Sequence, residues 1–269
     1  MSNTNKYGNW YETEVGSEIV KKKYCHDGEK TFPDVARRIK NCFPVDIGNK
    51  IEKMMLDADF FFGGRALYAL GCKGKFVAST SNCYVLPSPT DDLESIIDVS
   101  KEMAVIFSKG GGTGLNLSNL RPRGAKVNNV AKTSTGAVSF MELYNTIGKV
   151  ISQNGRRGAL LIGLNCDHPD IEEFLKIKQD NTSIQSANIS ILFTDEFMEA
   201  VNNHEDYELK FTLESGEVIT KTINAYDFFM DFCESNKDYG EPGAIFIDRV
   251  RGWHLLSEDG DYKIEISNP

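Results

Sequence analysis

The chain has no paired-cysteine motif. Its six cysteines are scattered along 269 residues without a Cys-x-x-Cys pair. That distribution argues against a structural zinc site and against the disulfide framework of a small secreted protein. No uninterrupted apolar run approaches the ~18 residues of a membrane span, and the N-terminus lacks the apolar core of a signal peptide. We therefore expect reduced thiols, a cytoplasmic location and no membrane partner.

The chain also lacks an excess of positive charge. Its net charge is −9, from 39 acidic and 30 basic residues. Because a polyanion binds to a basic face, this balance argues against a nucleic-acid partner. A single nucleotide needs only local positive charge, so a nucleotide site stays compatible with the composition. No internal repeat or low-complexity linker interrupts the chain.

Hydrophobic periodicity divides the chain into two regions. Residues 1–70 carry short helical stripes in a polar background, over residues 17–24, 33–40 and 49–56, which predicts an N-terminal helical domain. From Gly71 onward, apolar strands alternate with amphipathic helices, which predicts an α/β domain over residues 71–269. The predicted strands cover residues 82–86, 114–118, 159–164, 187–193 and 244–247.

The segments between these strands have helical periodicity. The first helix begins near Asp91, which has capping-box spacing to Glu94, and it ends at Gly110. Further helices are predicted over residues 137–151, 171–176, 197–201 and 225–234, with a hairpin turning at 215–216. Strands separated by helices pair in parallel through right-handed crossovers. Five strands are too few to close an eight-stranded barrel, so the sheet is open or is completed by another segment.

A glycine-rich run follows the first predicted helix of the α/β domain. It reads Lys109-Gly-Gly-Gly-Thr-Gly-Leu-Asn116, and two arginines follow at Arg121 and Arg123. Glycines let a ligand approach the backbone closely, and arginine forks onto phosphate oxygens. The run is neither a Walker loop nor a dinucleotide fingerprint. It predicts a nucleotide site, although glycine clusters are more often plain turns.

Several motifs in order resemble those of one enzyme family. They are Phe62-Gly-Gly-Arg65, Ser81-Asn-Cys-Tyr-Val-Leu-Pro-Ser-Pro89, Asp92-Leu-Glu-Ser-Ile96, Lys109-Gly-Gly-Gly-Thr-Gly-Leu-Asn116, Leu120-Arg-Pro-Arg-Gly-Ala125, Thr133-Ser-Thr-Gly-Ala-Val-Ser-Phe-Met141, Arg156-Arg-Gly-Ala159, Asp167-His-Pro-Asp-Ile171 and Ile266-Ser-Asn-Pro269. Together they resemble the catalytic subunit of a ribonucleotide reductase, most closely its adenosylcobalamin-dependent class II branch. That family builds a ten-stranded barrel from two five-stranded parallel halves. The resemblance therefore implies that residues 71–269 form the first half-barrel.

The resemblance also implies that part of the active site lies outside the chain. The family's pattern continues from Asn268-Pro269 into a Cys-x-Glu segment, whose cysteine becomes the thiyl radical that starts the reaction. We therefore expect an N-terminal portion that is inactive alone and acts with a C-terminal half. A split gene, an intein junction or a chosen expression boundary would each produce this end.

The resemblance assigns residues to the substrate site. Cys83 matches one of the two cysteines that reduce the substrate and become a disulfide, and Asn268 matches an asparagine that binds the substrate ribose. The other substrate-side matches are Ser81, Asn82, Gly111 and Gly112. Taken alone, a cysteine such as Cys83 is more often a small buried hydrophobe. The remaining five cysteines match no functional position.

A second nucleotide site is implied for the deoxynucleotide or ATP effector. Asp91 matches an acidic residue near the effector sugar, and Arg121 matches a contact to its phosphates. The other matches or helpers are Arg123, Lys126, Lys132, Gln153 and Arg157, the last two in a polar loop that conveys effector identity. Without the resemblance, Asp91 is a helix cap and the basic residues are a solvated loop.

Cofactor and partners follow from the same resemblance. It implies adenosylcobalamin, a ribonucleotide substrate, a thioredoxin-like reductant and a homodimer. We expect no protein-bound metal, because His168 has no second histidine at ligand spacing. Two alternatives remain open: a class I large subunit whose radical comes from a separate metal-containing subunit, and a nucleotide-binding regulatory module without catalysis.

Overall fold

The structure is a computed structural model that describes residues 10–72, 79–127, 130–153, 156–179, 184–255 and 263–269. The chain forms two compact units, Met1–Asn82 and Cys83–Pro269. Each unit is considered by itself. The predicted domain boundary at residue 70 stays a prediction.

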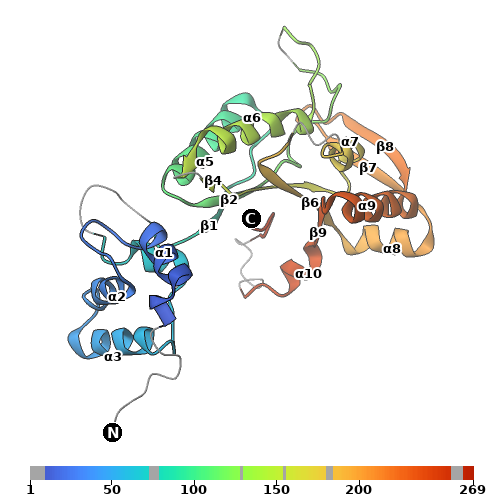
Figure 1. The fold of residues 1–269 in the computed structure, drawn as a ribbon. Helices are drawn as coiled ribbons and strands as arrows, with labels where there is room; N and C mark the ends of the chain where they lie inside the picture. Colours follow the sequence, from blue (N-terminus) through green and yellow to red (C-terminus); the bar gives the residue numbers. More distant parts are fainter. Residues whose placement is uncertain (1–9, 73–78, 128–129, 154–155, 180–183, 256–262) are drawn as a thin grey trace. The chain divides into compact units, whose positions relative to one another are not determined.

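The first unit is helical. Its elements are η1 (Trp10–Glu12), α1 (Glu14–Lys23), α2 (Phe32–Lys40), α3 (Val45–Leu56) and α4 (Gly64–Ala69) (Figure 1). Phe32, Val35 and Ile39 recur at helical spacing along α2 and are buried with Met55. The sequence predicted α1, α2 and α3, but it missed α4, which is only six residues long.

The second unit is built on a parallel sheet, as predicted. The strands are β1 (Cys83–Val85), β2 (Gly112–Asn116), β5 (Leu160–Asn165), β6 (Ala187–Phe193) and β9 (Gly243–Phe246). They pair in the order β1-β2-β5-β6-β9, and every pairing is parallel. All five predicted strands are confirmed: β6 has the predicted ends, and the ends of the other four are shifted by one or two residues.

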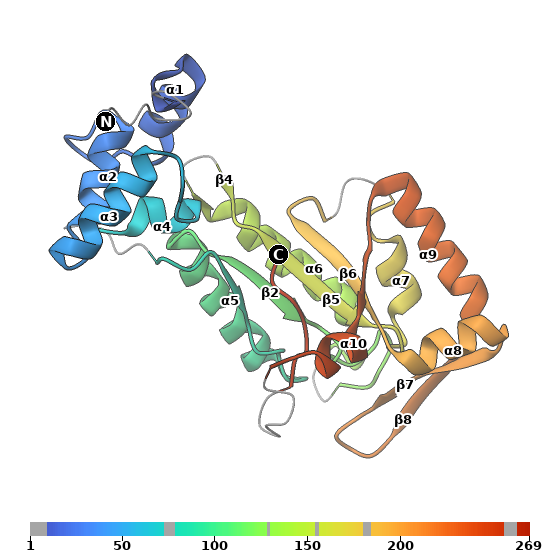
Figure 2. The same cartoon turned by 90° about the horizontal axis from the view of Figure 1, so that it is seen from below.

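Helices cover one face of this sheet (Figures 1 and 2). They are α5 (Leu93–Ser108), α6 (Ala137–Val150), α7 (Ile171–Lys176), α8 (Asp195–Asn203) and α9 (Ala225–Tyr239). The hairpin β7 (Asp206–Thr212) and β8 (Val218–Asn224) lies between α8 and α9 in the sequence, the short pair β3 (Ser152–Gln153) and β4 (Arg156–Arg157) follows α6, and α10 (Ile247–Gly252) follows β9. None of the helices in the described ranges has the length and hydrophobicity of a membrane span.

The two faces of the sheet differ in side-chain size. On β5, Leu160, Ile162 and Leu164 point to the helical face and belong to the main core. The alternate residues Leu161 and Gly163 point the other way, as the two-residue period of a strand requires. We call this second face the inner face. Along β2 and β5 it is covered by the C-terminal segment, residues 263–269 (Figure 2), and Ile247 at the start of α10 joins Leu161 and Ile266 in the same small cluster.

The start of α5 corrects one prediction. The N-cap is Asp92, whose side chain accepts a hydrogen bond from Ser95 N at 2.8 Å, so Asp91 is not the cap. Hydrogen bonds from Thr90 and Ser95 hold the pKa of Asp92 below its ordinary value. The predicted end of the helix is confirmed, because Gly110 follows Lys109 with φ of 86°. The carboxylate of Asp91 instead accepts hydrogen bonds from Arg121.

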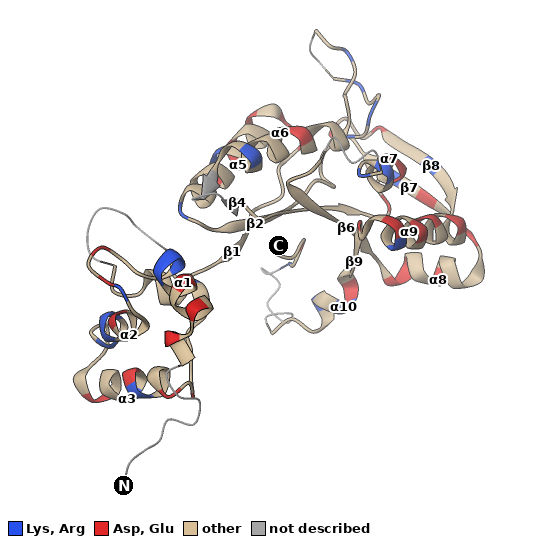
Figure 3. Cartoon of the chain, viewed as in Figure 1, with Lys and Arg blue, Asp and Glu red and all other residues tan. Residues whose placement is uncertain are grey.

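The helices α8 and α9 carry several acidic residues. Figure 3 shows them along α8 and α9. They include Asp195, Glu196, Asp227 and Asp231. In the loop that follows β2, the basic residues Arg121, Arg123 and Lys126 each meet a carboxylate partner.

Candidate functional site

The inner face carries a track of glycines. Gly112 and Gly114 lie two residues apart on β2, and Gly163 lies on the neighbouring β5. A methyl group on Gly114 would overlap the carbonyl oxygen of Ser267, and one on Gly163 would overlap the side chain of Ile266. The absence of side chains therefore makes room for the C-terminal segment.

The C-terminal segment runs antiparallel to β2 along this track. Glu265 O accepts a hydrogen bond from Asn116 Nδ2 at 3.0 Å, at the carboxyl end of the strand. At the amino end, the Cβ position of Gly112 lies 3.0 Å from Pro269 Cγ. The segment thus brings its last residues to the end of the sheet where the parallel strands begin, which we call the amino edge; the carboxyl edge is the end where they finish.

Cys83 lies at the same edge. It is the first residue of β1 and is in register with Gly112 of β2. Its thiol contacts Pro269 O at 3.7 Å, and the Cβ position of Gly114 lies 3.2 Å from Asn268 Cα. Cys83, Gly112 and Asn268 therefore lie close together, as expected from the sequence. Their chemical roles remain predictions.

Gly111 has another neighbour. Its Cβ position would lie 2.6 Å from Ile106 Cγ2 and 2.8 Å from the ring of Tyr84. These residues belong to α5 and to the side of β1 that faces it, so Gly111 permits close packing on the helical face. Packing is therefore one reason for a glycine at this position, and its predicted place on the substrate side stays a prediction.

Ser81 and Asn82 belong to the first unit. Ser81 N donates to Ser79 Oγ at 3.0 Å, and Asn82 Oδ1 accepts from Arg65 Nε at 3.3 Å. Both residues are exposed. Their predicted place on the substrate side stays a prediction.

Asp91 and Arg121, two of the predicted effector residues, bind each other. Arg121 Nε donates to Asp91 Oδ2 at 2.7 Å, and Arg121 N donates to Asp91 Oδ1 at 2.9 Å. A second guanidinium nitrogen donates to Lys126 O at 2.6 Å. Asp91 thus orients the guanidinium and the backbone of the loop that follows β2. A guanidinium has five N–H donors, so Arg121 keeps donors for an anion in this orientation.

Arg123 forks onto Glu173 of α7, with distances of 2.8 and 2.5 Å. The hydrogen bond that Arg123 donates to Glu173 raises the pKa of Arg123. The two side chains are 54% and 36% exposed, so the pair contributes little to stability. Lys126 is more exposed and lies 3.8 Å from Glu217. Lys132 is in the same loop and has a φ of 64°.

Gln153 and Arg157 lie at the amino edge of the sheet, just before β5 begins, whereas the Arg121 loop follows the carboxyl end of β2. Their backbones pair in the β3–β4 hairpin, Ser152 with Arg157 and Gln153 with Arg156, where we expected an irregular loop. This hairpin follows α6, whereas the Arg121 loop precedes it. The 14 residues of α6 span about 20 Å at the helical rise. One copy of the chain therefore does not bring the two groups of predicted effector residues together.

His168 is a structural histidine. It is 2% exposed. Its Nδ1 accepts from Asp170 N at 3.0 Å, which leaves the proton on Nε2 to donate to Leu120 O at 2.9 Å. Both ring nitrogens are occupied by backbone groups. Within the described ranges, no group of three or more His, Cys, Asp or Glu side chains is placed to bind a metal ion.

Asp170 was missed by the sequence analysis. Its carboxylate accepts from Arg123 N at 3.0 Å and from Ala137 N at 2.9 Å. The N-cap of α6 is Gly136, which has no side chain, so Asp170 caps this helix from another loop. The Asp167-His-Pro-Asp170 motif was recognised, but no sequence spacing indicates a cap that acts over 33 residues.

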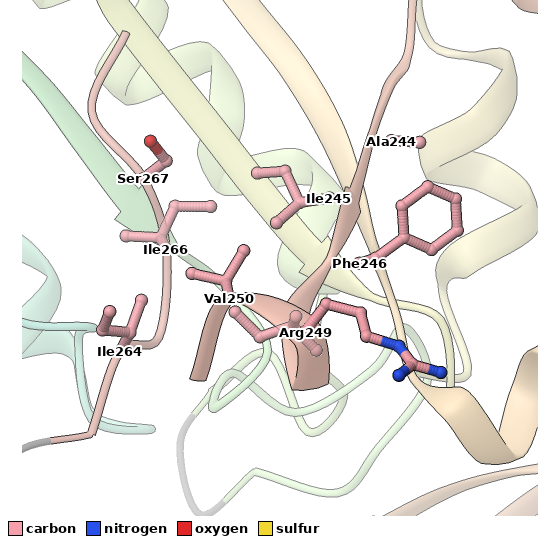
Figure 4. Close-up of a pocket in the computed structure, with 9 residues that line it drawn as sticks. Ala244, Ile245, Phe246, Arg249, Val250, Ile264, Ile266 and Ser267 are labelled. Atoms are coloured by element: carbon pink, nitrogen blue, oxygen red, sulfur yellow. The ribbon is translucent and has the colours of Figure 1, made fainter. Parts of the chain in front are cut away.

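An apolar pocket of about 420 Å³ lies between β9, α10 and the C-terminal segment. Ile245, Val250 and Ile266 line it (Figure 4). Arg249 also lines the pocket, and its guanidinium pairs with Asp195 at 3.1 Å. The pocket therefore presents mainly hydrocarbon beside the C-terminal segment.

Comparison with known proteins gives a consistent result. A family model described as "Ribonucleotide reductase, barrel domain" matches residues 81–269. The vitamin B12-dependent ribonucleoside-diphosphate reductase of Thermoplasma acidophilum is 34% identical over 223 residues, which make up 82% of this chain and 28% of that protein. The enzyme of the same name from Mycobacterium tuberculosis is 34% identical over 191 residues, 70% of this chain and 27% of that protein.

A solved structure shares the fold. The class Id ribonucleotide reductase alpha subunit of Actinobacillus ureae aligns with a TM-score of 0.74 at 19% identity, over 95% of this chain and 44% of that one. The chain spans about a quarter of the length of the two curated relatives. With the barrel-domain model covering the whole parallel sheet and its glycine track, the chain belongs to the ribonucleotide reductase family.

Proposed function

We propose that the chain supplies the first half-barrel of an enzyme that reduces ribonucleotides to deoxyribonucleotides. The observation that carries this proposal is the meeting of Cys83, Gly112 and the Asn268–Pro269 end at one edge of the sheet. In this proposal the chain acts together with a downstream half, which corresponds to the part of the relatives that this chain does not cover. We also propose a cytoplasmic location, where its six free thiols stay reduced.

Cys83 is the proposed reductant. After a radical step at the substrate, the 2′-hydroxyl leaves as water, and two thiols supply two electrons and become a disulfide. One thiol is Cys83, and the other comes from the downstream half. A thioredoxin-like dithiol then reduces that disulfide and is itself oxidised. Asn268 is the proposed contact to the ribose.

The test uses the reductase assembled from this chain and its downstream half. Cys83→Ser is expected to abolish turnover with the dithiol reductant, measured as deoxynucleotide formed, because serine cannot supply electrons. Cys42→Ser is the matched control, since Cys42 is also a free thiol but lies in the other unit. Wild-type turnover by the Cys83→Ser enzyme would refute the assignment.

We further propose that a deoxynucleotide or ATP effector binds at the loop that contains Arg121. The support is the oriented Asp91–Arg121 pair beside the basic residues Arg123, Lys126 and Lys132. Gln153 and Arg157 lie at the opposite edge of the sheet, so they reach the same effector only from a second copy of the chain. A homodimer is therefore part of this proposal.

Adenosylcobalamin is the proposed cofactor, because both curated relatives described above are named vitamin B12-dependent reductases. When bound, this cofactor supplies the initial radical. The described residues alone do not form a corrin site: the apolar pocket has Arg249 paired with Asp195, and the buried His168 has both nitrogens occupied. The cofactor would be held mainly by the complete enzyme. Turnover that requires a separate radical-generating subunit instead would favour the class I alternative.

A further inference from the structure

The C-terminal segment follows β2 with a constant register. Asn116 meets Glu265, Gly114 meets Ser267 and Gly112 meets Pro269. For every two residues that β2 advances, the facing position in the segment moves two residues toward its N-terminal end, as in an antiparallel arrangement. A chance crossing would give contact at one point, whereas this segment stays in contact along the full strand.

The Asn116 side chain fixes one end of this register. It is 5% exposed, and its amide is fully used. Nδ2 donates to Glu265 O at 3.0 Å and to Asn165 Oδ1 at 3.1 Å, while Oδ1 accepts from Ser118 N at 2.9 Å. A buried polar group with all partners satisfied specifies one arrangement, because a shifted segment would leave the amide without a partner.

Two more contacts hold the same end of the segment. Ser88 Oγ donates to the carboxylate of Glu265. Arg251 Nε donates to Ile264 O at 2.9 Å. These residues come from the loop after β1 and from α10, so three separate elements hold residues 264–265. The glycines then let the chain lie flat against the sheet up to Cys83.

We propose that Gly112, Gly114, Gly163 and Asn116 form a seat that sets the register of residues 265–269 and thereby holds Asn268 and Pro269 beside Cys83. These four are positioning residues, since none of them needs to touch the reacting atoms. The role of the seat in turnover rests on the proposed reductase function. Its effect on the segment does not, so the two can be tested separately.

The first experiment measures the alkylation rate of Cys83 in the 269-residue chain by mass spectrometry. Gly114→Ala places a methyl group on Ser267 O, and Asn116→Asp removes both Nδ2 donors while keeping the acceptor for Ser118. Displacing the segment uncovers the thiol, so each variant is expected to raise the rate at least about fivefold through local opening. Gly148→Ala is the matched control, because its Cβ would meet only ordinary contacts at 3.8 Å or more.

The rate at Cys42 serves as an internal reference, because this exposed thiol lies in the other unit. Faster alkylation of Cys83 alone supports the seat. Equal rates at Cys83 in wild type, Asn116→Asp and folded Gly114→Ala would overturn it. Should Gly114→Ala fail to fold, Asn116→Asp decides the question.

The second experiment separates the seat from the proposed function. In the assembled reductase, Asn116→Asp is expected to lower kcat with an unchanged effector dissociation constant, because the seat acts on the active site and not on the effector loop. An unchanged kcat would overturn the positioning role. If the wild-type enzyme forms no deoxynucleotide, the reductase proposal fails, and the alkylation rates still decide whether the seat exists.

Discussion

His168 is held by backbone groups on both sides of its imidazole ring, at the junction between β5 and α7. Burial lowers the pKa of His168, since a charged ring would lose its hydration. The neighbouring Asp167 is partly buried, and this burial raises the pKa of its carboxyl group. The ring is therefore neutral in the folded protein. It connects Leu120 to Asp170, the residue at the start of α7.

This burial predicts a dependence of stability on pH. In the unfolded chain His168 takes up a proton below pH ~6.5, whereas the folded protein resists protonation until a lower pH. The free energy of unfolding should therefore fall as pH drops below ~6.5, by up to ~1.4 kcal/mol per pH unit. Chemical denaturation at pH 7.5 and 5.5 measures this loss.

His168→Gln should reduce the difference between the two pH values, because glutamine does not titrate and can still donate to Leu120 O. Asp167 contributes to the pH dependence of both proteins, so the comparison between them isolates the histidine. His204→Asn, at an exposed histidine, is the control and should leave the difference unchanged. A wild-type pH dependence in His168→Gln would show that another group is responsible.

The helices and strands of the second unit show what sequence patterns can predict. Runs of apolar residues identify all five strands, because the helical face of a covered parallel sheet must be hydrophobic. The same patterns give the wrong cap for α5, since Asp91 and Asp92 are adjacent and only packing assigns Arg121 to one of them. They also miss Asn116 as a contact, because its partner Glu265 lies 149 residues away.

The capping of α6 by Asp170 leads to a prediction at this scale. Asp170→Ala leaves the N–H groups of Arg123 and Ala137 without their acceptor, and Ala137 is fully buried. Each unsatisfied buried donor costs about 1–3 kcal/mol, so the variant should lose about 2–4 kcal/mol of unfolding free energy. Urea denaturation provides the measurement.

Asp170→Asn retains one oxygen acceptor and should lose less than the alanine variant. Asp98→Ala, at an exposed position on α5, should change stability by less than about 0.5 kcal/mol. If Asp170→Ala were as stable as Asp98→Ala, the carboxylate would not be the cap that holds α6.

At the scale of the molecule, an exposed apolar stripe runs along α5 of the second unit. Leu93, Ile97 and Val105 lie along α5 and are 67%, 49% and 46% exposed. Their spacing of four and eight residues places them along one side of the helix. A two-fold axis through this stripe would make the helices of two copies antiparallel. The carboxyl edge of one sheet would then lie beside the amino edge of the other.

This arrangement predicts that dimerisation and effector binding are coupled. Ile97→Glu places a charge in the stripe and should convert the proposed dimer to a monomer, which sedimentation velocity measures. The effector dissociation constant should rise in the same variant, because Arg121 and the β3–β4 hairpin no longer meet. Val45→Glu, which also replaces an exposed valine (78%) but lies in the first unit, should change neither quantity. A monomeric Ile97→Glu protein with wild-type effector affinity would show that one copy contains the whole effector site.

The path of residues 265–269 has a practical consequence for producing the protein. The carbonyl oxygen of Pro269 lies 3.7 Å from the thiol of Cys83, so any purification tag fused after Pro269 would begin against that thiol and would have to leave across the amino edge of the sheet. Such a fusion would crowd the thiol of Cys83. Affinity handles for this protein therefore belong at its N-terminus, which lies in the other unit.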